Sequence, residues 1–113
     1  MQGALPELVR VADSDLCVIL SNALENALRA CQPLAAAGKP CAIEVRFEQR
    51  GERILIQISN PFEGEVRFQN GVPVTDKPGH GLGVQSICAV VGRYGGMYSF
   101  LAEDGRFILR ISV

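Results

Sequence analysis

The chain has 113 residues, of which 48% are hydrophobic, and its 11 basic and 12 acidic residues leave a formal net charge of -1. This length and apolar content predict one domain over residues 1–113, with a single modest core. The balanced charge, without a long run of like charges, argues against a nucleic-acid partner. No apolar stretch reaches the roughly 18 to 20 residues of a spanning helix, and the first residues lack the pattern of a signal peptide, so we expect a cytoplasmic domain.

The sequence has four widely spaced cysteines, Cys17, Cys31, Cys41 and Cys88. Its single histidine is His80. A structural zinc site needs clustered thiolate and imidazole ligands, so zinc ligation is not expected. Isolated cysteines in a cytosolic domain behave as small apolar side chains. We therefore interpret all four as reduced core residues and not as a disulfide framework.

The first half of the chain has the pattern of a helix followed by a strand pair. An N-cap cluster, Asp13 to Asp15, precedes apolar residues that recur every three or four positions, which predicts an amphipathic helix over about 14–36. Gly38 and Pro40 end it. Apolar and polar residues then alternate on both sides of a polar turn at 49–52, so residues 41–60 are predicted to form an antiparallel hairpin with one face toward the helix.

The second half begins with a long irregular segment. Between 61 and 80 the periodicity disappears and Pro, Gly, Asn and Asp are frequent, which predicts a loop without a regular element of its own. A second helix follows from about Val84 and ends at Tyr94 to Gly96, and two strands at 97–102 and 106–113 meet at the turn Asp104-Gly105. This order of elements predicts an α+β two-layer sandwich.

Polar residues on the first helix form the first candidate site. Asn22, Asn26 and Arg29 have i, i+4, i+7 spacing, so two amides and a guanidinium share one flank beside the apolar stripe. An amide oxygen can bind a hard cation such as magnesium, and an arginine can approach phosphate oxygens. A solvated helix face is the alternative explanation of the same pattern.

Two further candidates lie where loops meet regular elements. Asn60 precedes Pro61 at the end of a predicted strand, where its side chain could hydrogen-bond a base edge or merely form a turn. The segment Gly79-His80-Gly81-Leu82-Gly83 opens the second helix, whose first N–H groups favour phosphate. It is neither the dinucleotide fingerprint nor a P-loop, and a simple loop-to-helix junction is the alternative.

The order and spacing of these features resemble a known family. The segment DLCVILSNALENALRAC resembles the N box of the GHKL (Bergerat-fold) ATPases, and GHGLGVQSICAVVGRYGG resembles their second glycine box with its helix. ISNP at 58–61 stands where the first glycine box is found. The resemblance spans about residues 6–113 and is closest to the quorum-sensing (AgrC-like) class of sensor histidine kinases. It implies a mixed, mostly antiparallel sheet with helices on one face and a long ATP lid at about 61–80.

The resemblance implies roles for the residues of the first helix. Asn26 matches the magnesium ligand of the N box, Arg29 the basic residue that approaches the phosphates of ATP, and Ala30 lies beside it in the nucleotide-binding segment. Asn22 matches a glutamate that serves as general base in ATP-hydrolysing members. An amide cannot activate water, so the sequence favours phosphoryl transfer to a protein side chain over hydrolysis.

The remaining binding residues implied by the resemblance lie around the lid. Asn60 matches an aspartate that accepts a hydrogen bond from the adenine amino group, and an amide should make that contact more weakly. Lys77, at the far end of the lid, is placed to reach a phosphate, and an ordinary exposed loop lysine is the alternative. The second glycine box is expected to fold over the triphosphate with His80 lining the pocket or facing solvent, and it comprises Gly79, His80, Gly81, Leu82 and Gly83.

As a whole, the resemblance implies the catalytic domain of a protein histidine kinase that binds Mg²⁺ and ATP or ADP. The acceptor histidine would lie on a separate dimerisation helix, and a response regulator would take the phosphoryl group onward. No histidine precedes the N box, and the expected upstream strand is reduced to about 8–11, so we expect an N-terminally truncated piece of a membrane-bound homodimeric receptor, inactive alone. Two alternatives are a degenerate interaction module that binds nucleotide weakly and an anti-sigma-type serine kinase, which Asn22 disfavours.

Overall fold

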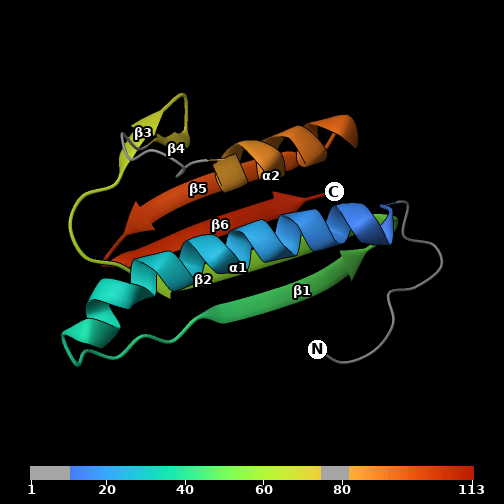
Figure 1. The fold of residues 1–113 in the computed structure, drawn as a ribbon. Coiled ribbons are helices and arrows are strands. Elements are labelled where there is room, and N and C mark those ends of the chain that lie inside the picture. Colours follow the sequence, from blue (N-terminus) through green and yellow to red (C-terminus); the bar gives the residue numbers. More distant parts are fainter. Residues whose placement is uncertain (1–10, 75–81) are drawn as a thin grey trace.

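A computed structural model describes residues 11–74 and 82–113. Two helices and six strands follow one another in this part of the chain (Figure 1): α1 (Asp13–Ala36), β1 (Glu44–Arg50), β2 (Arg53–Pro61), β3 (Arg67–Gln69), β4 (Val72–Val74), α2 (Leu82–Arg93), β5 (Met97–Glu103) and β6 (Arg106–Ser112). Neither of these helices is both long enough and apolar enough to cross a membrane.

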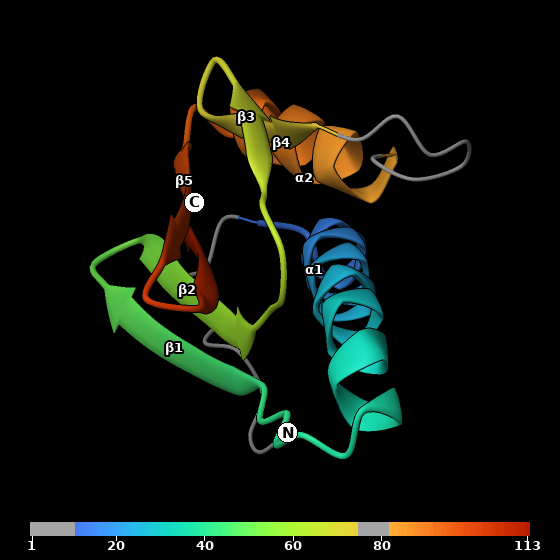
Figure 2. The same ribbon diagram turned by 90° about the vertical axis from the view of Figure 1, so that its left-hand side faces the viewer.

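Four strands form one sheet in the order β1-β2-β6-β5, and every pair in it is antiparallel. Both helices pack on the same side of this sheet, as the view along the strands shows (Figure 2). The predicted α+β two-layer sandwich is therefore confirmed. The two central strands, β2 and β6, carry most of the sheet's buried side chains because strands flank them on both edges.

The core lies between the helices and the central strands. α1 buries one stripe at helical spacing, including Ile19, Ala23 and Ala27, against alternate residues of β2 and β6. The predicted strand β1 is present, but all seven of its residues are exposed, with Val45 at 40% and Phe47 at 43%. Val45 and Phe47 lie on the helix side of the sheet, as predicted, because they pair with the buried Ile58 and Ile56, but this part of the face is not covered. α1 packs on β2, and β1 extends beyond it as the edge strand.

The predicted irregular segment contains a small hairpin. β3 and β4 pair antiparallel, with Gln69 opposite Val72, so the connection is a two-residue turn. Asn70 and Gly71 both have positive φ, 53° and 77°, as the tight turn of a right-twisted hairpin requires. The prediction of a segment without regular structure is therefore wrong for residues 67–74. The Asn-Gly pair was the signal that could have found the hairpin.

The cysteines also differ from the prediction. Cys31 near the end of α1 and Cys41 before β1 form a disulfide, with their Cα atoms 5.7 Å apart. Cys17 is exposed and Cys88 is half-buried. The interpretation as four reduced core residues is wrong, because the chain turns back after α1 and brings two of the thiols together, which their separation of 10 in the sequence does not reveal.

Candidate functional site

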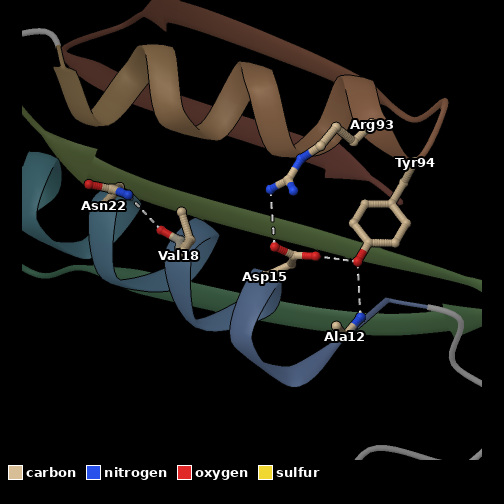
Figure 3. Close-up of polar contacts among 6 residues, drawn as sticks. All are labelled: Ala12, Asp15, Val18, Asn22, Arg93 and Tyr94. Atoms are coloured by element: carbon tan, nitrogen blue, oxygen red, sulfur yellow. Dashed lines mark hydrogen bonds and ion pairs between the residues drawn. The ribbon is translucent and has the colours of Figure 1, made fainter.

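The middle of α1 meets the beginning of α2 at a polar contact. The Asn22 side-chain N–H donates to the carbonyl of Val18, one turn earlier, at 2.8 Å (Figure 3). A Cβ atom on Gly83 would stand 3.1 Å from the Asn22 amide oxygen, closer than most such contacts. Because Gly83 has no side chain, the first turn of α2 can lie this close to the Asn22 amide. The segment that resembles the N box and the end of the segment that resembles the second glycine box are therefore in contact.

Asn26 lies one helical turn beyond Asn22. Its side chain is half-buried, and within the described residues it takes part in no hydrogen bond. A half-buried amide without such a partner can still bind a ligand, because its oxygen has unused acceptor capacity. This is the position for which the resemblance to the GHKL ATPases implies a magnesium ligand.

Arg29 does not join the two amides in this structure. It is exposed and forms an i, i+4 ion pair with Glu25, with Nη2 and Oε1 2.5 Å apart. The next residue, Ala30, is half-buried. The predicted polar row thus exists on α1, but its guanidinium is held by a carboxylate of its own helix.

Asn60 is a strand residue and not part of a turn. It pairs with Phe107, and the following Pro61 still pairs with Arg106, so the turn interpretation of this Asn-Pro pair is wrong. Asn60 is only 2% exposed, and its side-chain N–H donates to the Pro61 carbonyl at 2.9 Å. The ribbon shows α1 and β2 side by side and ending at the same side of the molecule (Figure 1), and Asn60 is the next-to-last residue of β2.

Several predicted site residues cannot be placed. Lys77, Gly79, His80 and Gly81 lie outside the described residues, and so does the side chain of Leu82, the first residue of α2. Among residues 11–74 and 82–113, no three His, Cys, Asp or Glu side chains are grouped to hold a metal ion. A cation at this site would therefore depend on amide oxygen and on the ligand's own oxygens.

The other end of the helix pair carries a polar network that the sequence did not predict. The Tyr94 hydroxyl donates to the Asp15 carboxylate and accepts from the Ala12 backbone N–H at 3.1 Å, while Arg93 contacts the same carboxylate at 3.1 Å (Figure 3). Asp15 was expected in an N-cap cluster, but Ala12 is the N-cap residue and makes no side-chain cap bond. The aspartate lies inside the first turn and joins the two helices.

These observations define an α+β domain in which the Asn22 amide of one helix lies against Gly83 at the start of the other. The fold resembles that of the catalytic domain of histidine kinase ThkA in a nucleotide-free form, with a TM-score of 0.68 and 15% sequence identity over 93% of this chain and 69% of that chain. Residues 12–113 match the model of the GHKL domain, so the chain belongs to the GHKL family. A comparison with curated proteins finds no match. The resemblance to the GHKL ATPases is confirmed, and the AgrC-like class stays a prediction.

Proposed function

We propose that this domain binds ATP with Mg²⁺ in the space bounded by α1, the first turn of α2 and the C-terminal end of β2. The observation that carries the proposal is the approach of Gly83 to the Asn22 amide, 3.1 Å from a built Cβ, because it joins the two segments that a GHKL nucleotide site requires. Asn26, one helical turn beyond Asn22, and Asn60, near the end of β2, would supply further polar groups.

Different residues of the site would bind different parts of Mg-ATP. Asn26 offers its amide oxygen to Mg²⁺, which would neutralise phosphate charge when bound. Arg29 can leave Glu25 for a phosphate at little cost, because an exposed ion pair contributes only about 0.5 kcal/mol. Asn60 is proposed to accept from the adenine amino group. The start of α2 would present backbone N–H groups to the phosphates. In the sequence it follows the segment that contains Lys77, Gly79, His80 and Gly81, which are proposed to bind the phosphates too.

We further propose that the γ-phosphoryl group is transferred to a histidine on a separate dimerisation helix and then to a response regulator. Position 22 carries an amide, which cannot serve as a general base for water. Transfer to a positioned imidazole needs orientation and charge neutralisation more than a base. In this proposal the chain works in the cytoplasm as part of a membrane-bound homodimer, with residues 61–80 as its lid.

Isothermal titration with ATP and ADP tests the binding step. Asn26→Ala should weaken binding about tenfold or more in Mg²⁺, which is the loss of about 1.4 kcal/mol, and should change it little in EDTA. Gln32→Ala is the matched control, since it removes an exposed amide farther along α1. Equal affinities of wild type and Asn26→Ala in Mg²⁺ would overturn the assignment.

The transfer step has its own measurement. The domain is mixed with radiolabelled ATP and a polypeptide that carries a dimerisation helix with an acceptor histidine. Label on the acceptor should be acid-labile and base-stable, as phosphohistidine is, and should be lost with Asn26→Ala. Acid-stable label on serine would contradict transfer to histidine.

One observation favours a second candidate, a GHKL-fold interaction module with little nucleotide binding. The Asn60 side chain replaces a charged carboxylate by a neutral amide and already donates to the Pro61 carbonyl. A neutral acceptor forms a weaker hydrogen bond than a carboxylate does. Absence of binding heat at millimolar ATP and Mg²⁺, with a folded domain, would favour this module.

A further inference from the structure

The sheet has a second face that no described helix covers. Both helices lie on one side, and the opposite side of β1, β2, β6 and β5 is open within the described part of the chain (Figure 2). Strand registers place alternate residues on this open face, and they fall into rows across the four strands. One row is Arg46, Gln57, Arg110 and Ser99, and another is Glu48, Leu55, Ser112 and Met97.

The charges of this open face differ from those of the rest of the domain. Its side chains include five arginines and three glutamates, although the whole chain has a net charge of -1. Four arginines of this face form no ion pair with a carboxylate among the described residues: Arg46, Arg53, Arg106 and Arg110. The open face therefore has an excess of positive charge, on the side away from the proposed nucleotide site.

A shallow trough of about 410 Å³ crosses the four strands between the two rows. Arg46 and Arg110 stand on one wall, on either side of Gln57, which accepts a hydrogen bond from Arg110 at 3.0 Å. Leu55 and Met97 stand on the other wall, and Met97 is 73% exposed, the largest value among the exposed large apolar residues. Glu48, which forms an ion pair with Arg50, and Ser112 lie on this second wall too. The trough thus has one cationic wall and one partly apolar wall.

We propose that this trough binds an acidic amphipathic helix of a partner protein. Four strands about 4.8 Å apart span about 14 Å, which is the length of about ten helical residues. Arg46 and Arg110 stand on alternate strands, about 10 Å apart, as do Leu55 and Met97. Helical residues at i and i+7 are separated by about 10.5 Å. Two carboxylates of the partner helix with this spacing would pair with Arg46 and Arg110. Apolar residues next to them on the same helix would cover Leu55 and Met97.

The shape and chemistry favour a helix of a protein over other anionic partners. An extended segment lying on the face would leave its backbone N–H and C=O groups without partners there, whereas a helix satisfies its own. Nucleic acid would use mainly the charges and leave the Met97 side exposed. An anionic membrane is flat and would not fill the trough between the two rows. Adaptable methionine side chains are common at surfaces that bind amphipathic helices.

The test uses a fluorescent, lactam-constrained helical peptide of about 14 residues with leucines on one stripe and glutamates at i and i+7 beside it. Fluorescence anisotropy with the whole domain should show saturable binding. Met97→Glu is expected to weaken it about tenfold or more, and Arg46→Gln with Arg110→Gln by about the same factor together. Asn26→Ala and Mg-ADP should leave it unchanged, so this result is independent of the proposed function.

Matched variants make the assignment specific. Arg53→Gln removes a cation of the same face outside the trough lining, and Leu28→Glu alters an exposed apolar residue of α1. Both should bind the peptide like wild type, and a peptide with glutamine in place of glutamate should bind more weakly. Absence of binding, or an equal loss in Arg53→Gln, overturns the proposal. So does stronger, trough-dependent binding of anionic vesicles or duplex DNA, or self-association of the domain that Met97→Glu abolishes.

Discussion

The two ends of the α1–α2 contact use polar groups in opposite ways. At one end, Asp15, Tyr94, Arg93 and the Ala12 backbone satisfy each other (Figure 3). At the other end, Asn22 is bound only to its own helix, and Asn26 has no hydrogen bond within the described residues. The first end fixes how the helices pack, and the second leaves amide groups for a ligand. If nucleotide binds as proposed, the same helix pair separates stability from binding along its length.

A glycine lies at each end of the α1–α2 contact, Gly96 at one and Gly83 at the other. A side chain added at these two positions would contact different neighbours. At Gly96, just after α2, a Cβ would stand 2.3 Å from the Ser112 carbonyl oxygen of the backbone. At Gly83 it would meet a side-chain amide at 3.1 Å. Backbone in a paired strand cannot yield, whereas an amide side chain can move by a few tenths of an ångström. The same substitution should therefore test stability at one end and binding at the other.

Gly96→Ala is expected to have the largest effect. The added methyl group must push apart β5 and the end of β6, which should lower the free energy of unfolding by about 3 kcal/mol. Urea unfolding measures the change. Gly92→Ala is the control, because its Cβ would meet nothing within 4 Å, and in a helix it should stabilise by up to about 1 kcal/mol. A Gly96→Ala variant as stable as wild type would show that the contact is not rigid.

Reduction of the disulfide tests the part of α1 that extends beyond α2. The Cys31–Cys41 bridge closes a loop with a sequence separation of 10, and its loss should cost about 2 to 3 kcal/mol through the entropy of the unfolded chain. Thermal unfolding with and without dithiothreitol measures this, and Cys31→Ser should reproduce it. Cys17→Ser changes an exposed free thiol and should have no effect. An unchanged midpoint on reduction would argue that α2 and the sheet hold the helix without the bridge.

Asp15→Ala should lower stability by a smaller amount and leave nucleotide binding unchanged. It removes the carboxylate that Tyr94 and Arg93 share, which should cost about 1 to 2 kcal/mol, mostly through the Tyr94 hydroxyl because Arg93 is exposed. Nucleotide affinity should stay within about twofold of wild type, since the site lies at the other end. A large loss of affinity at unchanged stability would remove the distinction between the two ends.

Gly83→Ala should have the smallest effect on stability and a selective effect on binding. Alanine favours the helix by up to about 1 kcal/mol, but its methyl group displaces the Asn22 oxygen. We expect affinity for Mg-ATP to fall about fivefold, which corresponds to about 1 kcal/mol, while Gly92→Ala leaves it unchanged. Calorimetry checks both variants. Unchanged affinity in Gly83→Ala would place the ligand away from Asn22.

Local rules account for the parts that were predicted correctly. The apolar stripe of α1, the alternation on β2 and the Asp104-Gly105 turn, with φ of 51° and 74°, each depend on residues close in sequence. The Asn70-Gly71 turn follows the same rule and could have been predicted, but its flanking strands of three residues are too short to show alternation. The order of N box and glycine box was sufficient to recognise the family.

The remaining features depend on contacts between distant parts of the chain. The sequence determined which faces of the helices and strands are apolar, because periodicity is a local property. Only the tertiary structure decided that β1 lies beyond the helix layer, that Cys31 meets Cys41, and that Asp15 meets Tyr94, 79 residues away. Such partners depend on how whole elements cross and where the chain turns back, and no spacing within a single element encodes that geometry.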